Sequence, residues 1–139
     1  MTGVAASNLT ILLVEETALL RNAVTRMLTD MGYQVAAAAS AEAALALIKS
    51  GKPIDLLVTD IVLPGGIDGE ELAAAARRLC PAMPVLFTSG YTEWRLQAAA
   101  GSDEKTGLIS KPYTRGELAV KLRALLERVP RAPASGDKP

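Results

Sequence analysis

Five short apolar runs alternate along the chain with longer segments of helical periodicity. An apolar run of this length, bounded by turn-forming residues, is typical of a strand that is buried on both faces of a parallel sheet. Strands that alternate with helices predict an α/β fold, in which a doubly wound five-stranded parallel sheet carries helices on both faces. The predicted strands are residues 10–14, 33–39, 56–60, 84–89 and 108–110.

The second of these runs is ambiguous. In it, Val35 is followed by four alanines, and alanine favours helix by intrinsic propensity. Only the position of residues 33–39 between two helical segments predicts a strand, so this assignment depends on the surrounding fold.

Capping and helix-breaking residues bound the helical segments. Thr17, Ser40 and Thr114 are placed to cap helices, and a further helix opens at Asp68 or Gly69. A short helix is also expected over residues 93–100. The residues that close the other helices are Gly32, Gly51, Pro81 and Pro130. The inward face of the helix before Pro81 is predicted to contain Leu72, Ala75, Ala76 and Leu79.

The composition excludes several kinds of function. Lys plus Arg and Asp plus Glu number 15 each, so no charge excess points to direct nucleic-acid or membrane binding. The chain has no His, which excludes Ser-His and Cys-His catalysis and His-containing zinc sites. The single Cys80 cannot form an internal disulfide and is expected to be a buried or half-buried thiol. No run is long enough to span a bilayer and no signal peptide is visible, so we expect a cytoplasmic protein.

The length of 139 residues suits one domain. We expect a folded domain over residues 9–129, preceded by a flexible N-terminus over residues 1–8. Residues 130–139 are rich in Pro, Ala, Ser and Gly and are predicted to be a disordered C-terminal tail.

Polar side chains lie at the carboxyl ends of four of the predicted strands. They are the pair Glu15 and Glu16, Asp60, Ser89 and Lys111. A parallel sheet brings the carboxyl ends of its strands to one edge, where open α/β sheets bind ligands. Separate structural roles, such as Asp60 capping the next turn, are the alternative, but they require four independent coincidences.

These side chains suit phosphoryl chemistry. Clustered carboxylates favour a cation, and hard oxygen ligands select Mg²⁺. An ionised Asp is a candidate phosphoryl acceptor, and transfer to it requires the charge on the phosphoryl oxygens to be neutralised. Neutralisation of this charge requires cations and hydrogen-bond donors. A metal ion, the Lys111 ammonium and the Ser89 hydroxyl are groups of these types.

The chain resembles the receiver domain of two-component response regulators over about residues 9–129. The motifs that carry the resemblance are Leu13-Val14-Glu15-Glu16, Asp60 with Pro64 and Gly69, Thr88-Ser89-Gly90 and Lys111-Pro112-Tyr113. The resemblance implies a (βα)5 flavodoxin-like fold. It also implies a partner, a sensor histidine kinase or histidine phosphotransfer protein, whose phosphohistidine supplies the phosphoryl group.

The resemblance assigns a role to each residue of the set. Asp60 is implied to be the phosphoacceptor, Ser89 the switch hydroxyl and Lys111 the phosphate-binding lysine. Glu15, Glu16, Asp60 and the backbone carbonyl of Val62 are implied to bind Mg²⁺.

Three features depart from the usual receiver pattern. Glu16 stands where the second acid is usually Asp, and its extra methylene group disturbs the strict geometry that Mg²⁺ requires. The loop from Pro64 to Gly69 is one residue longer than the common form, and Leu108 replaces the usual switch aromatic. Of the aromatic residues near the fourth and fifth strands, Tyr91, Trp94 and Tyr113 are predicted to form a partner face.

The sequence therefore predicts a single-domain response regulator that switches a protein-interaction face, acts on a downstream protein target and catalyses only its own phosphotransfer and dephosphorylation. Homodimerisation is left open. An Asp-nucleophile phosphohydrolase is disfavoured, because Val62 stands where such enzymes usually carry a second Asp. Two alternatives remain open: a pseudo-receiver that never takes phosphate, which Glu16 favours, and a receiver fragment of a hybrid histidine kinase.

Overall fold

The computed structural model describes residues 9–63, 65–90 and 104–128. Its centre is a five-stranded parallel sheet with the strand order β2-β1-β3-β4-β5. This confirms the fold class expected from the alternating pattern. The strands are β1 (Thr10–Val14), β2 (Gln34–Ala38), β3 (Leu56–Asp60), β4 (Val85–Ser89) and β5 (Thr106–Ser110).

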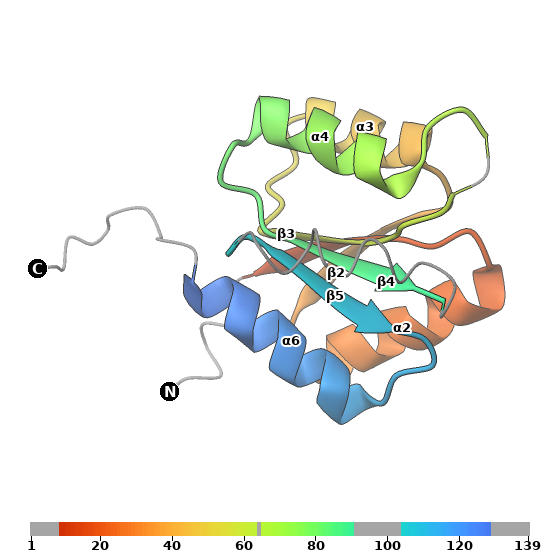
Figure 1. The fold of residues 1–139 in the computed structure, drawn as a ribbon, viewed down its shortest axis with the longest axis vertical. Helices are drawn as coiled ribbons and strands as arrows, with labels where there is room; N and C mark the ends of the chain where they lie inside the picture. The colour runs from red at the N-terminus through yellow and green to blue at the C-terminus, as the bar shows by residue number, and fades with distance from the viewer. Residues whose placement is uncertain (1–8, 64, 91–103, 129–139) are drawn as a thin grey trace, which may run out of the picture.

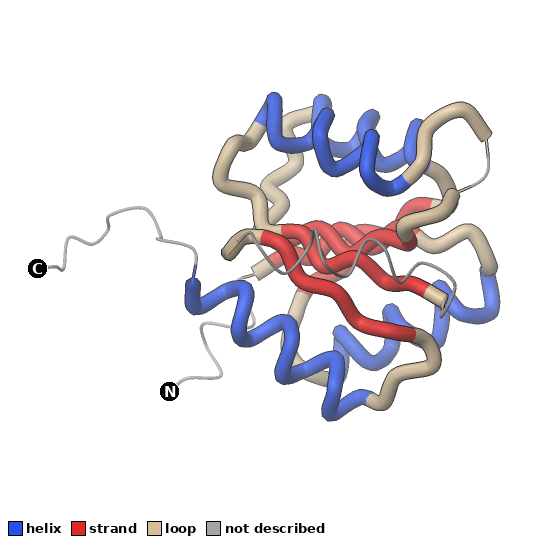
Figure 2. The backbone as a smooth tube through the Cα atoms, viewed as in Figure 1, coloured by secondary structure: helices blue, strands red, loops and turns tan. Residues whose placement is uncertain are grey.

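Helices cover both faces of the sheet, and Figures 1 and 2 show the strands as a layer between two helical layers. One layer contains α3 (Ala41–Lys49) and α4 (Gly69–Leu79), and the other contains α2 (Ala18–Asp30) and α6 (Arg115–Arg128). The helix expected over residues 93–100, the N-terminus 1–8 and the tail 130–139 lie outside the described residues. In the part of the chain that the structure describes, no helix combines the length and apolar character that a bilayer crossing requires.

The sheet separates two apolar cores. The core under α3 and α4 is built around Leu12, Leu57 and Leu72, and the core under α2 and α6 around Leu28, Val58 and Leu118. Consecutive residues of one strand therefore pack into opposite cores, as Leu57 and Val58 of β3 do. This explains why β3 is apolar on both faces and why all five of its residues are buried.

The alanine-rich segment is a strand. β2 pairs with β1 in register, from Thr10 opposite Gln34 to Val14 opposite Ala38. Ala36 and Ala38 are buried in the core under α3 and α4. Packing and sheet hydrogen bonds thus override the helical propensity of the alanines.

Three of the predicted caps form as expected. Ser40 Oγ accepts a hydrogen bond from the Ala43 N–H at 3.1 Å. Reciprocal capping boxes join Asp68 to Glu71 at the start of α4 and Thr114 to Glu117 at the start of α6.

The fourth predicted cap differs. Thr17 occupies the cap position of α2, but its side chain makes no capping hydrogen bond. Instead, Glu15 Oε2 accepts a hydrogen bond from the Thr17 N–H at 3.0 Å. The carboxylate of Glu15 therefore stabilises the turn that leads into α2.

Three smaller predictions were wrong. β5 begins at Thr106 rather than at residue 108, because Thr106 pairs with Val85 of the neighbouring strand. Leu79 is exposed, since the buried stripe of α4 is Gly69, Leu72, Ala73 and Ala76. Cys80 is exposed as well, and it is the C-cap of α4, where the backbone leaves the helical conformation.

Candidate functional site

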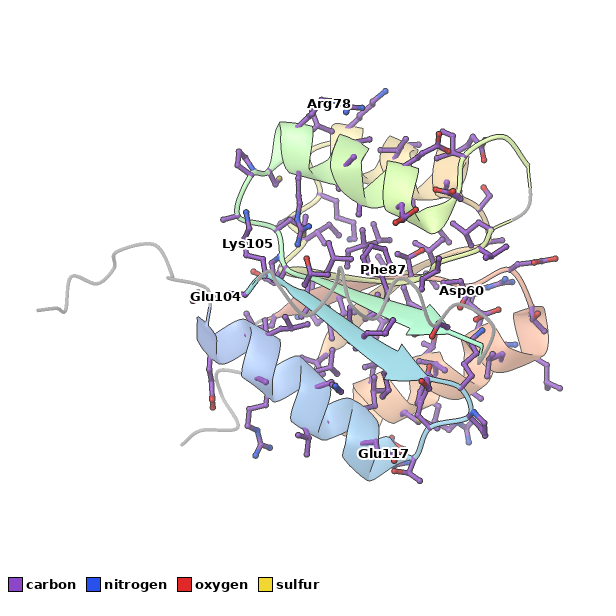
Figure 3. All side chains as sticks on the ribbon, in the orientation of Figure 1. Asp60, Arg78, Phe87, Glu104, Lys105 and Glu117 are labelled. Carbon is purple, nitrogen blue, oxygen red and sulfur yellow. The ribbon has the colours of Figure 1, made fainter. Side chains whose placement is uncertain are left out.

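The register of the sheet gathers the predicted residues at one edge. The N–H of Ile61, directly after Asp60, donates to the Thr88 carbonyl at 3.0 Å, and the Lys111 N–H donates to the Ser89 carbonyl at 2.8 Å. The end of β4 thus joins the strand of Asp60 to the strand that precedes Lys111. Figure 3 shows Asp60 at the end of the sheet where the strand arrows terminate.

A single ammonium group bridges two carboxylates in this site. Lys111 Nζ lies 2.8 Å from Asp60 Oδ1 and 3.2 Å from Glu15 Oε1. The Asp60 and Glu15 side chains are 12% and 7% exposed, whereas that of Lys111 is 29% exposed. Removal of one partner from such a shielded cluster would leave an uncompensated charge.

Burial and charge shift the pKa values of this pair. Burial raises the pKa of Asp60, and the nearby Glu15 charge adds to this, although hydrogen bonds from Lys111 and Thr88 oppose it. Burial alone would lower the pKa of Lys111, but the hydrogen bonds and charges of Asp60 and Glu15 outweigh it, so the pKa is raised. The ammonium therefore stays protonated beside a carboxylate that is poor in water contacts.

Two hydroxyl groups lie at the end of β4. Thr88 Oγ1 donates a hydrogen bond to Asp60 Oδ1, and Thr88 is the register partner of Asp60. Sequence reasoning assigned no role to Thr88. Ser89, the predicted switch residue, is 3% exposed, and its Oγ has no hydrogen-bond partner among the described residues. An unpaired buried hydroxyl is unusual and makes Ser89 available to a group that arrives in the site.

Arg21 fixes the loop that carries the two adjacent acids. Its guanidinium donates to the backbone carbonyls of Glu15 at 2.8 Å and of Glu16 at 3.2 Å. The Glu15 side chain is directed into the site, whereas Glu16 is exposed. Among the described residues, no three acidic, His or Cys side chains form a group that could hold a metal ion.

Two of the four predicted ligands nevertheless suit a magnesium ion. Glu15 and Asp60 both contact one cation, the Lys111 ammonium. Mg²⁺ usually takes only one or two protein carboxylates and keeps several waters. Glu15 and Asp60 fit that pattern, whereas the roles of Glu16 and of the Val62 carbonyl stay predictions.

Gly69 supports the backbone beneath Asp60. A Cβ atom at this position would lie 2.0 Å from the Asp60 carbonyl oxygen and 2.9 Å from that of Ile61. The Gly69 N–H also donates to the Ile61 carbonyl at 2.8 Å. Only glycine allows α4 to begin so close to the strand that carries the acid.

The predicted partner face is described only in part. Tyr113 is half-buried and packs against the core under α2 and α6. Burial raises its pKa to about 12. Tyr91 and Trp94 lie outside the described residues. Leu108 is partly buried against the core under α3 and α4.

The family model of the response regulator receiver domain matches residues 11–123. The chain belongs to the response regulator receiver family. The matched region contains Glu15, Asp60 and Lys111, which meet in the structure. A receiver domain is a component of two-component signalling, and it is generally not an enzyme in the usual sense.

Curated proteins of two named kinds are similar to this receiver domain. The chain is 34% identical over 120 residues to the sensor kinase CckA of Brucella abortus, covering 86% of this chain and 13% of that protein. It is also 34% identical over 120 residues to the transcriptional regulatory protein AfsQ1 of Streptomyces coelicolor, covering 85% of this chain and 51% of that protein. The chain therefore spans about half or less of the length of these curated relatives.

A solved structure of a response regulator receiver protein from Sinorhizobium medicae is also similar. It superposes with a TM-score of 0.77 at 34% identity and covers 86% of this chain and 94% of that chain. This similarity supports the receiver fold.

Proposed function

We propose that this receiver domain accepts a phosphoryl group on Asp60 from the phosphohistidine of a sensor histidine kinase or a histidine phosphotransfer protein. The observation that carries the proposal is the contact of the buried Asp60 carboxylate with the Lys111 ammonium, at 2.8 Å. The 139 residues contain no His, so the phosphohistidine donor lies outside them.

The proposed mechanism assigns a task to each residue. A carboxylate oxygen of Asp60 attacks phosphorus while the bond from phosphorus to the donor breaks. Lys111 compensates charge on the phosphoryl oxygens, and Glu15 keeps the ammonium in place. Mg²⁺, held by Glu15 and Asp60 with Glu16 and the Val62 carbonyl as further predicted ligands, would supply additional charge neutralisation.

The proposed output is a change of a protein-interaction surface. Within the part of the chain that the structure describes, the buried Ser89 hydroxyl has no hydrogen-bond partner, so a phosphoryl oxygen on Asp60 would give it an acceptor and draw it inward. The proposed interaction face contains Tyr91, Trp94 and Tyr113, of which Tyr113 is held against the core. Such a local hydrogen-bond change is a common way to bias a two-state surface.

Intact-mass measurement after incubation with acetyl phosphate and Mg²⁺ tests the acceptor. The wild type should gain one phosphoryl group, and Asp60→Asn should gain none, because the amide is not a nucleophile. Asp30→Asn is the matched control, since Asp30 is an exposed Asp whose carboxylate pairs with Arg115 rather than with Lys111. An undiminished gain in Asp60→Asn would contradict the assignment.

One observation favours a second candidate, a pseudo-receiver that never takes phosphate. Glu16 is exposed, and the described residues contain no group of three metal-binding side chains. Such a module would show no mass gain in the wild type even at high Mg²⁺ and acetyl phosphate. The same experiment therefore separates the two candidates.

A further inference from the structure

A second hydroxyl group contacts the proposed phosphoacceptor. Thr88 Oγ1 donates to Asp60 Oδ1, and both residues are buried. The contact is built into the sheet, because Thr88 and Asp60 are register partners on adjacent strands. The next backbone hydrogen bond, from the Ile61 N–H to the Thr88 carbonyl at 3.0 Å, ties Thr88 to the residue that follows Asp60.

Both described contacts to the carboxylate use the same oxygen atom. Lys111 Nζ and Thr88 Oγ1 both contact Oδ1, which leaves Oδ2 as the oxygen that can attack phosphorus. We propose that the Thr88 hydroxyl stabilises the Asp60 carboxylate as it leaves phosphorus, and so shortens the lifetime of the phosphoryl group. This proposal rests on the proposed function of Asp60.

The sign of the effect follows from the charge on Oδ1 during hydrolysis. A water oxygen bonds to phosphorus, the bond from phosphorus to Oδ2 breaks, and its electron pair stays on the carboxylate. Inorganic phosphate leaves with the oxygen of water, and the proton passes to the solvent. Oδ1 changes from a neutral carbonyl oxygen to half of a carboxylate, and hydrogen bonds to charged acceptors are about twice as strong. The Thr88 hydrogen bond therefore strengthens as the phosphoryl group departs.

The two hydroxyls at the end of β4 have separate tasks in this scheme. Thr88 already has an acceptor on Asp60, whereas the Ser89 hydroxyl has none in residues 9–63, 65–90 and 104–128. Ser89 is free to respond to a phosphoryl group. Thr88 acts on the carboxylate that carries it.

The test measures the half-life of phosphorylated protein by intact mass after removal of acetyl phosphate, with Mg²⁺ kept constant. Thr88→Val removes the hydroxyl but keeps the shape, and it should lengthen the half-life about fivefold. Thr88→Ser restores a hydroxyl and should return the half-life to near the wild-type value. Thr88→Ala makes the same chemical deletion if Val does not fit.

Thr59→Val is the matched control. Thr59 is a fully buried neighbour of Asp60, but its hydroxyl donates to the Asp60 backbone carbonyl at 3.0 Å rather than to the carboxylate. Its loss should leave the half-life unchanged. An unchanged or shorter half-life in Thr88→Val, or an equal lengthening in Thr59→Val, would overturn the proposed role of Thr88.

The proposed function and this inference fail in different ways. If the wild type gains no mass, or Asp60→Asn still gains it, the acceptor is wrong, and the Thr88 role falls with it. If Asp60 is the acceptor and the Thr88 variants keep the wild-type half-life, only the role of Thr88 is wrong.

Discussion

The Lys111 ammonium lies 2.8 Å from Oδ1 of Asp60, although 51 positions separate the two residues in the chain. The sheet creates this contact, because β4 bonds to both the strand of Asp60 and the strand before Lys111. The ammonium is thus fixed beside the carboxylate before any phosphoryl group arrives. Preorganised charge of this kind needs little rearrangement during the reaction.

Replacing Lys111 with Met should therefore slow phosphorylation by acetyl phosphate about 100-fold. The change removes the only charge-compensating partner that Asp60 and Glu15 share in the described contacts. It also leaves two carboxylates close together, which raises the pKa of Asp60 further. Lys49→Met, an exposed change at the end of α3, is the control, and rates come from intact mass over time. Equal rates in the two variants would show that the ammonium takes no part.

Much of this site could be predicted from the sequence, because parallel strands place their carboxyl ends at one edge. Asp60, Glu15 and Lys111 are on that edge, and they meet. The sequence could not show which of the adjacent hydroxyls, Thr88 or Ser89, contacts Asp60. Successive strand residues point to opposite faces, so the answer depends on the register between β3 and β4, and a single sequence does not determine that register.

The sequence also could not show that Glu16 and Cys80 are exposed. Both residues lie just outside a regular element, where the periodicity that predicts burial no longer applies. Leu79 is different, because it belongs to α4, whose buried stripe contains Gly69 and Ala73 in place of the predicted Ala75 and Leu79. The alanines of β2 are a further case. Their local propensity favours a helix, but pairing with the neighbouring strand β1 makes the segment a strand.

Magnesium binding should depend on Glu15 more than on Glu16. The Glu15 carboxylate faces the site beside Lys111, whereas the Glu16 side chain is exposed. We expect Glu15→Gln to weaken Mg²⁺ binding at least about tenfold, which is roughly 1.4 kcal/mol, and Glu16→Gln to weaken it much less. Isothermal titration calorimetry measures both. A larger loss in Glu16→Gln would mean that the loop rearranges to place Glu16 on the metal.

Gly69→Ala should destabilise the fold by about 3 kcal/mol, the upper range for overpacking. The added Cβ would lie 2.0 Å from the backbone carbonyl oxygen of Asp60, and backbone cannot move aside as a flexible side chain can. Gly66→Ala is the matched control in the same loop, because its Cβ would meet nothing within 4 Å. Urea unfolding measures both free energies. If both variants lose the same small amount of stability, the start of α4 is not constrained by the strand.

Tyr113 should make the stability of the fold depend on alkaline pH. Burial raises the pKa of Tyr113 to about 12, with Lys111 lowering it and the charges of Asp60 and Glu15 raising it. In the unfolded chain the pKa is about 10. The folded state therefore keeps its proton longer, and the stability gained from this is complete below about pH 10 and is lost as the pH rises towards about 12.

Tyr113→Phe removes this titration but keeps the ring. Urea unfolding gives the free energy of unfolding of both proteins at about pH 9 and at about pH 11. The value for the Phe variant minus the value for the wild type should be larger at about pH 11 than at about pH 9. The pKa of Tyr33 is also raised by burial, but Tyr33 is present in both proteins, so its contribution cancels in the difference. A constant difference at the two pH values would mean that the Tyr113 hydroxyl reaches water in the folded state.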